Sequence, residues 1–118
     1  MGSHWEKVVV DAGDPARLAR WWAAALGYRI TQEAPGAVEI RRGSRDLPAL
    51  VFVLVTVPKT ARNRLRIDLR PDDRDAEVER LLDMGARHVD GGTGPDGGPG
   101  AVVLADPEGN EFRVLAPG

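Results

Sequence analysis

The segment at residues 8–29, VVVDAGDPARLARWWAAALGYR, decides the fold, because a related segment, LRIDLRPDDRDAEVERLLDMGAR, follows at residues 65–87. Asp11 in the first segment corresponds to Asp68 in the second, at a spacing of 57 residues. Each segment combines a short strand, a turn, an amphipathic helix and a glycine. A repeat that spans about half the chain indicates a duplicated module rather than a solenoid of many small units.

Both expected helices carry start and stop signals. Asp14 is a suitable N-cap, and Pro15 suits the first helical position, while Gly27 predicts a left-handed residue at the helix end. In the second copy we expect Asp72 to be the cap and Gly85 to end the helix. The apolar stripes are Leu18, Trp21, Trp22, Ala25 and Leu26 in the first helix, and Val78, Leu81 and Leu82 in the second. We expect these stripes, with at least one of the two tryptophans, to pack on a sheet.

Turn residues divide the remainder of each half into three further strands. The expected strands are 28–33, 37–42, 49–57, 87–90, 101–105 and 111–115. Each half therefore follows a βαβββ pattern. We predict an α+β fold with one domain over residues 1–118, composed of a module at about 5–58 and a module at about 63–117.

The composition excludes several classes of function. The chain has 118 residues, of which 42% are hydrophobic and 29% charged, as is typical of one globular domain. The net charge of −2 argues against a nucleic-acid partner, which calls for a basic surface. The absence of cysteine excludes disulfides, thiolate zinc sites and cysteine nucleophiles, and two histidines are too few for a multi-histidine metal site.

Neither a membrane partner nor export is expected. The longest apolar run, residues 49–57, is too short to cross a bilayer as a helix. The N-terminal sequence MGSHWEK lacks the charged and then apolar pattern of a signal peptide. We therefore expect a cytoplasmic protein.

The first strand of each module alternates between an apolar and a charged face. Lys7 and Asp11 lie on one face of the first strand, and Arg66 and Asp68 share the corresponding face in the second copy. Each helix must cover the apolar face of its sheet, so the charged faces are expected to point toward the space that the sheets enclose. Glu111 and Arg113 alternate in the same way in the last strand.

The fourth strand, residues 49–57, is apolar on both faces apart from Thr56. Either Leu50, Phe52 and Leu54 or Val51, Val53 and Val55 are expected to line the enclosed space. We take Phe52 and Leu54 as the candidate apolar contacts, and Trp5, just before the first strand, as a candidate at the rim of the cleft or in an interface. An apolar cleft with a few convergent polar groups is typical of a small-molecule site.

Three stretches together resemble a known superfamily. They are VVVDAGDPARLARWWAAALGY at residues 8–28, RLRIDLRPDD at 64–73 and VVLADPEGNEFRVLAP at 102–117. They are similar to the vicinal oxygen chelate superfamily of glyoxalases, bleomycin resistance proteins and extradiol dioxygenases, and most of all to its small glyoxalase-like branch. The resemblance implies curved sheets around a cleft, helices on the outer faces, and a homodimer.

Enzymes of that superfamily hold a divalent metal with His, Gln or Glu side chains, and the resemblance places those ligand positions on this chain. They fall on Lys7 in the first strand, on Arg66 in the second module and on Arg113 in the last strand, with the apolar residues 52–54 at the fourth strand. Cations at these positions would repel a divalent metal, so we expect neither a metal nor another cofactor. We expect Asp11, Asp68 and Glu111 to pair with these cations, because buried charges need partners.

Two functions remain open. The first is a metal-free protein that sequesters a partly apolar small molecule, as the drug-binding members of the superfamily do, with an anionic or carbonyl group meeting Lys7, Arg66 or Arg113. The second is a metal-independent lyase, isomerase or cyclase in which Asp11, Asp68 or Glu111 acts as acid or base. The candidate ligand-binding residues are Trp5, Lys7, Asp11, Phe52, Leu54, Arg66, Asp68, Glu111 and Arg113.

Overall fold

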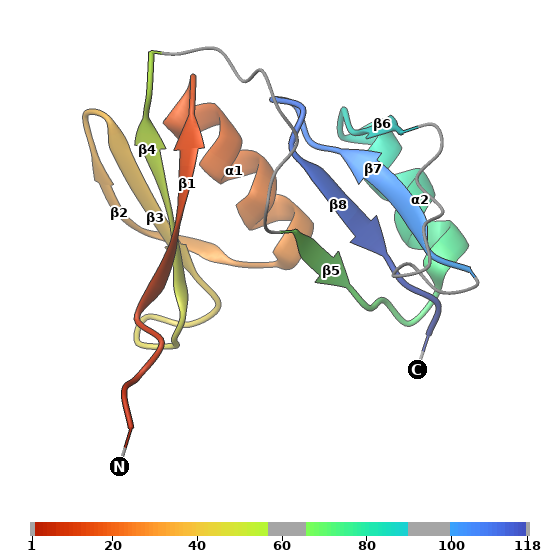
Figure 1. Cartoon of the computed structure of the whole chain (residues 1–118), viewed down its shortest axis with the longest axis horizontal. Helices are drawn as coiled ribbons and strands as arrows, with labels where there is room; N and C mark the ends of the chain where they lie inside the picture. Colours follow the sequence, from red (N-terminus) through yellow and green to blue (C-terminus); the bar gives the residue numbers. More distant parts are fainter. Residues whose placement is uncertain (1, 57–65, 90–99, 118) are drawn as a thin grey trace. The chain divides into compact units, whose positions relative to one another are not determined.

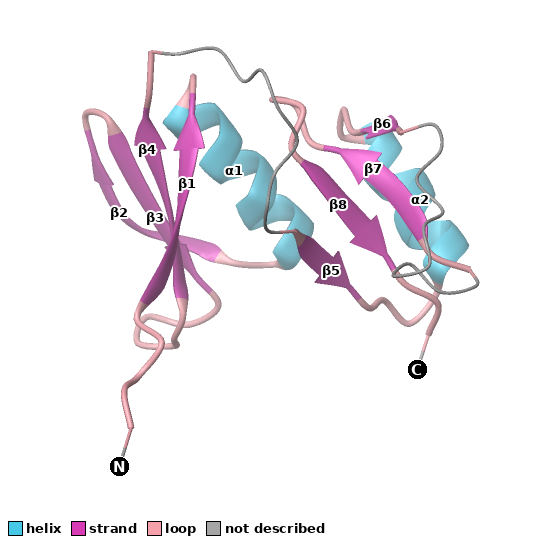
Figure 2. Cartoon of the chain, viewed as in Figure 1, coloured by secondary structure: helices cyan, strands magenta, loops and turns pink. Residues whose placement is uncertain are grey.

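The computed structural model describes residues 2–56, 66–89 and 100–117, and the chain divides into two compact units, Met1–Pro58 and Lys59–Gly118. Each unit contains one helix and one four-stranded sheet in the order βαβββ (Figure 1 and Figure 2). The α+β fold and its duplicated modules are therefore confirmed. The sequence-based boundary between the modules, residues 58–63, includes the division between the units.

The first unit contains β1 (Lys7–Ala12), α1 (Pro15–Leu26), β2 (Arg29–Ala34), β3 (Ala37–Arg41) and β4 (Ala49–Leu54). Its strands lie in the order β1-β4-β3-β2. β1 runs parallel to β4, and the other neighbours are antiparallel. The α1 crossover makes the parallel pairing possible, because a parallel neighbour cannot be reached through a tight hairpin.

The second unit repeats this arrangement with shorter strands. It contains β5 (Ile67–Leu69), α2 (Arg74–Asp83), β6 (Arg87–His88), β7 (Val102–Ala105) and β8 (Glu111–Val114). The order is β5-β8-β7-β6, and β5 is parallel to β8. All six strands expected after the helices are present, with ends displaced by up to three residues; residues 57 and 90, at the ends of two of them, lie outside the described residues.

The helix α1 begins and ends where its sequence signals predict. The Asp14 side chain accepts a hydrogen bond from the backbone N–H of Arg17 at 3.2 Å, and Pro15 is the first helical residue. Gly27 adopts φ 70°, a left-handed backbone conformation. This conformation is energetically less favourable for a residue with a Cβ than for glycine. The apolar stripe packs on the sheet, with Leu26 half-buried and the other four residues buried. Both tryptophans belong to it: Trp21 is 8% exposed, and Trp22 is 3% exposed. Their rings meet edge to face with centroids 5.0 Å apart.

The N-cap of α2 is Asp73, and the prediction of Asp72 is wrong. The Asp73 carboxylate accepts the backbone N–H of Ala76 at 3.1 Å, and its backbone is extended, as a cap requires. Three residues separate Leu69 at the end of β5 from this cap, whereas one separates Ala12 from Asp14 in the first unit. The longer connection places the α2 cap two residues further from its strand than the α1 cap, and the sequence alone could not distinguish the two adjacent aspartates.

The two adjacent aspartates offer a matched test of this cap. We expect Asp73→Ala to lower the free energy of unfolding by about 1 kcal/mol, because the backbone N–H of Ala76 loses its partner. The control Asp72→Ala should change it by less than about 0.5 kcal/mol. Chemical denaturation followed by circular dichroism measures both, and a larger cost for Asp72→Ala would contradict the assignment.

Candidate functional site

Strand alternation gives each sheet one face that its own helix covers and one that it leaves free, called here the helix-free face. In the first unit, Val10 is the register partner of Phe52 on the covered face, whereas Val9 and Val51 are partners on the helix-free face. Lys7 and Asp11 alternate with Val10 and also lie on the helix-free face, as expected. Both side chains are exposed.

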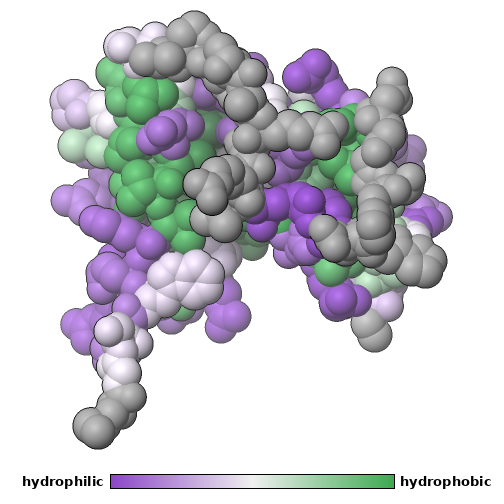
Figure 3. Space-filling model, viewed as in Figure 1, coloured by the Kyte–Doolittle hydropathy of each residue, from purple (hydrophilic) through white to green (hydrophobic). Residues whose placement is uncertain are grey.

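The apolar residues of the helix-free face differ from those predicted. Phe52 is only 1% exposed and belongs to the core with α1, so its assignment as a ligand contact is corrected. Leu54, the partner of Ala12 at the strand end, is 53% exposed. The helix-free face instead presents Val51 and Val53 from β4, both half-buried, beside Val9, which is 52% exposed. Figure 3 shows apolar side chains gathered at the surface over β1 and β4.

A polar network occupies the same face of the first sheet. Arg41 donates from Nε and Nη2 to the two oxygens of Glu39, at 3.2 Å each, and the hydroxyl of Thr31 donates to Glu39 Oε2 at 2.8 Å. The bond from Arg41, followed by that from Thr31, lowers the pKa of Glu39, and the charge of Lys7 contributes in the same direction. Glu39 is therefore held as an anion with its charge already compensated.

The sequence gave a partial signal for this network. Glu39 and Arg41 are two residues apart in a predicted strand and alternate with Val38 and Ile40, so one face was predictable. Thr31 was not predictable, because an irregularity in the β2–β3 register between Ile30 and Gln32 displaces it from simple alternation.

The second sheet places three of the candidate residues in direct contact. Asp68 on β5 and Arg113 on β8 are register partners. Arg113 donates from Nε to Asp68 Oδ1 at 2.9 Å and from Nη2 to Oδ2 at 2.5 Å, a bidentate pair. Arg66 donates from Nε to the same Oδ1 at 3.3 Å. The pairing expected for Asp68 is thus present.

The environment of Asp68 stabilises its charged form. The bidentate bond from Arg113 is the main cause of its lowered pKa; burial opposes the shift, and Arg66 adds to it. Arg113 itself is 7% exposed, so the Asp68 carboxylate compensates a guanidinium charge that has little contact with water. A carboxylate held in this way is a structural counterion rather than a proton acceptor.

The other two predicted carboxylates, Glu111 and Asp11, lie on the helix-free faces of different sheets and have different neighbours. Glu111 is the register partner of Ala105, which in turn partners Arg87, so these three form the next row of the second sheet. Asp11 is the partner of Val53 and has no ion pair among the described residues. Trp5, at 67% exposure, precedes β1 and is open to solvent.

The two repeats differ at one set of equivalent positions. The backbone N–H of Val55 bonds to Ala12 in the first unit, and that of Leu115 bonds to Leu69 in the second, which fixes the equivalence of β1 with β5 and of β4 with β8. By this register, Arg66, Asp68 and Arg113 correspond to Val9, Asp11 and Val53. One module therefore offers an apolar surface where the other offers two guanidinium groups.

These residues do not fit a divalent metal. Three of the four positions that the resemblance assigns to metal ligands are cations: Arg66 and Arg113, both bound to Asp68, and Lys7. The described ranges contain no group of three or more His, Cys, Asp or Glu side chains arranged to hold an ion. Guanidinium and ammonium groups have no lone pair to offer a metal.

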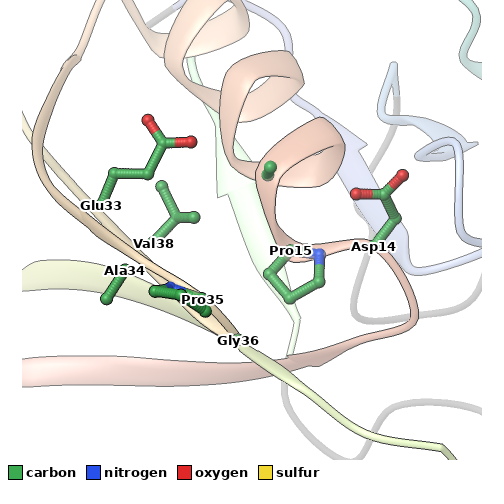
Figure 4. Close-up of a pocket in the computed structure, with 8 residues that line it drawn as sticks. Asp14, Pro15, Glu33, Ala34, Pro35, Gly36 and Val38 are labelled. Carbon is green, nitrogen blue, oxygen red and sulfur yellow. The ribbon is translucent and has the colours of Figure 1, made fainter.

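A separate groove lies between the start of α1 and the β2–β3 turn (Figure 4). It has a volume of about 390 Å³, and its walls include Asp14, Pro15, Glu33 and Val38. None of the predicted binding residues lines it. Asp14 is occupied as the helix cap, and Glu33 is bonded to Arg20 at 2.9 Å, so both acidic groups serve the structure.

Residues 7–115 match the family model for the glyoxalase-like domain. The chain belongs to the glyoxalase-like domain family. The resemblance to the vicinal oxygen chelate superfamily is thus confirmed. No curated protein matches the sequence significantly. Neither of the two described helices is long and apolar enough to span a bilayer.

Solved structures share the fold at low sequence identity. A glyoxalase/bleomycin resistance protein/dioxygenase family enzyme from Burkholderia phytofirmans is 15% identical with a TM-score of 0.72, over 97% of this chain and 98% of its own. The trypanothione-dependent glyoxalase I of Leishmania major is 14% identical with a TM-score of 0.69, over 98% and 87%. An antibiotic-binding protein from a Streptomyces species is 25% identical with a TM-score of 0.62, over 98% and 97%.

Removal of the Asp68 charge should destabilise this glyoxalase-like protein in a pH-dependent way. We expect Asp68→Asn to lower the free energy of unfolding at pH 7 by about 2 kcal/mol, since it leaves the Arg113 guanidinium buried without its counterion. This is less than a fully buried pair costs, because the Asp68 side chain is 34% exposed.

The pH dependence follows from the lowered pKa of Asp68. A depressed carboxyl pKa stabilises the fold at pH values above the unfolded pKa of about 3.9, and this contribution is lost as the pH falls through the lower folded value. The difference between wild type and Asp68→Asn should be constant above about pH 5 and shrink below about pH 4. Urea titrations from pH 7 to pH 2 measure it; a difference that does not shrink would rule out this role for Asp68.

Proposed function

We propose that this glyoxalase-like protein binds and sequesters a partly apolar small molecule without a metal ion. The observation that carries the proposal is the Arg66–Asp68–Arg113 cluster, whose two guanidinium groups lie at positions that the resemblance assigns to metal ligands. A protein built in this way can supply shape, apolar surface and hydrogen bonds, which are sufficient for affinity.

Two further observations support a binding role. Val9, Val51 and Val53 give the first sheet an accessible apolar strip beside the Glu39–Arg41 pair. The Streptomyces relative named above is an antibiotic-binding protein of nearly the same length as this chain. Sequestration of an antibiotic, and hence resistance to it, is the corresponding role for this protein.

Binding is preferred to catalysis because of the state of the best-placed carboxylate. A general base is most effective when its pKa lies near the working pH. Asp68 is shifted in the opposite direction by Arg113, and Glu39 is shifted likewise by Arg41 and Thr31. These partners hold both Asp68 and Glu39 as anions, so neither is suited to act as a general base in a lyase, isomerase or cyclase reaction.

The proposal also includes a cytoplasmic homodimer. Two exposed apolar side chains of the first unit, Trp5 and Leu54, are suited to contact with a second copy. Size-exclusion chromatography followed by light scattering should give a particle with twice the mass of one chain. A mass of one chain at micromolar concentration would contradict the dimer and leave ligand binding to be tested separately.

A neutral aromatic probe tests the binding function. We expect 2-naphthamide to bind in the presence and absence of EDTA and to be recovered unchanged by liquid chromatography and mass spectrometry. Val9→Gln should weaken binding about fivefold, because it removes apolar contact from the helix-free face of the first sheet. Leu47→Gln, a change at a similarly exposed residue outside the strands, is the control.

Three results would count against this function. They are loss of binding with EDTA, consumption of the probe by the protein, and equal weakening by the two substitutions. Isothermal titration calorimetry supplies the affinities, and thermal unfolding confirms that both variants remain folded.

A further inference from the structure

We infer that Arg66 is the anchor for an anionic group, a carboxylate in particular, on the ligand of this protein, and that Asp68 and Arg113 position it. The inference rests on the proposed binding function and names the chemistry that the second sheet recognises. The sequence alone did not distinguish the three cations Lys7, Arg66 and Arg113 as possible anchors, whereas the structure gives each of them a different environment.

Arg113 is excluded as the anchor by its own contacts. Its Nε and Nη2 atoms are both committed to Asp68, at 2.9 and 2.5 Å, and the residue is 7% exposed. A ligand that took these donors would have to displace the carboxylate and leave it with Arg66 alone. The bidentate pair is therefore a fixed part of the sheet.

Lys7 is a weaker anchor for a geometric reason. It is an exposed residue at the start of β1, an edge strand of the first sheet, and the described residues give it no hydrogen bond or ion pair that would hold its ammonium in place. Its flexible four-carbon stem makes it a mobile point charge. Its charge contributes to the lowered pKa of Glu39 in the network already described.

The Arg66 guanidinium is oriented by one hydrogen bond and still has donors that a ligand can use. Its Nε bond to Asp68 at 3.3 Å orients the guanidinium, and its side chain is 39% exposed. Among the described residues it makes no other hydrogen bond, so both terminal nitrogens, Nη1 and Nη2, retain donors for a ligand. These two nitrogens match the two oxygens of a carboxylate in a fork that a lysine cannot form.

The charge of the surrounding face favours an anion. Arg66 and Arg113 share one carboxylate, that of Asp68. The next row adds Glu111 and Arg87. Among the described residues, these two rows of the second sheet thus carry three guanidinium groups and two carboxylates. A ligand carboxylate would bring the number of carboxylates in these rows to three, equal to the number of guanidinium groups.

A pair of probes of equal shape tests this assignment. 2-Naphthoate carries a carboxylate, and 2-naphthamide replaces it with a neutral amide. Wild type should bind 2-naphthoate about tenfold more tightly than 2-naphthamide. Arg66→Gln should remove this preference while leaving the affinity for 2-naphthamide within about twofold, and Arg66→Lys should restore only part of it, because it returns the charge without the fork.

Arg17→Gln is the matched control, since it removes the same charge from an exposed position on α1. Calorimetry gives the affinities, and amide shifts in nuclear magnetic resonance titrations should move in β5 and β8 for 2-naphthoate. Equal affinity for the two probes in wild type, or a preference that survives in Arg66→Gln, would overturn the anchor and leave the binding function intact. Failure of both probes to bind would overturn the inference together with the proposed function.

Discussion

A buried guanidinium on β8 needs a carboxylate, and the parallel register of β5 and β8 places Asp68 opposite Arg113. The turn that precedes β8 supports this pairing. The last strand is preceded by a turn in which Asp106, fully buried, accepts the backbone N–H groups of Glu108 and Asn110 at 2.9 Å each. This turn fixes where β8 begins and therefore which of its residues meets Asp68.

The duplication allows the two modules to diverge in chemistry while their backbones stay alike. A parallel strand pair next to a crossover helix gives each module one covered face and one helix-free face. The first module keeps valines at the positions where the second has Arg66 and Arg113. An apolar surface in one module and a cationic surface in the other thus arise from one repeated plan.

The fold was largely predictable from local signals. Asp14, Pro15 and Gly27 define α1 through capping and left-handed geometry, which depend only on neighbouring residues. Strand alternation also predicted the face shared by Lys7 and Asp11. The adjacent aspartates before α2 marked the limit of this reasoning, because the cap depends on the length of the preceding loop.

The candidate site was predictable only in part. The sequence predicted a partner for Asp68, and the structure supplies two, Arg113 and Arg66. The choice between the two faces of β4 was wrong for Phe52, because an apolar strand carries no charge to show which side the helix covers. That side depends on the pairing with β1, a contact between residues about 40 positions apart in the chain.

Metal content is the measurement that tests the central claim most directly. The purified protein should be incubated with nickel, zinc and manganese salts in turn, dialysed, and analysed by inductively coupled plasma mass spectrometry. Because guanidinium and ammonium groups occupy the positions that the resemblance assigns to metal ligands, far less than one metal ion should remain for each chain. One tightly held ion per chain, lost on substitution of Asp68 or Glu111, would contradict the account.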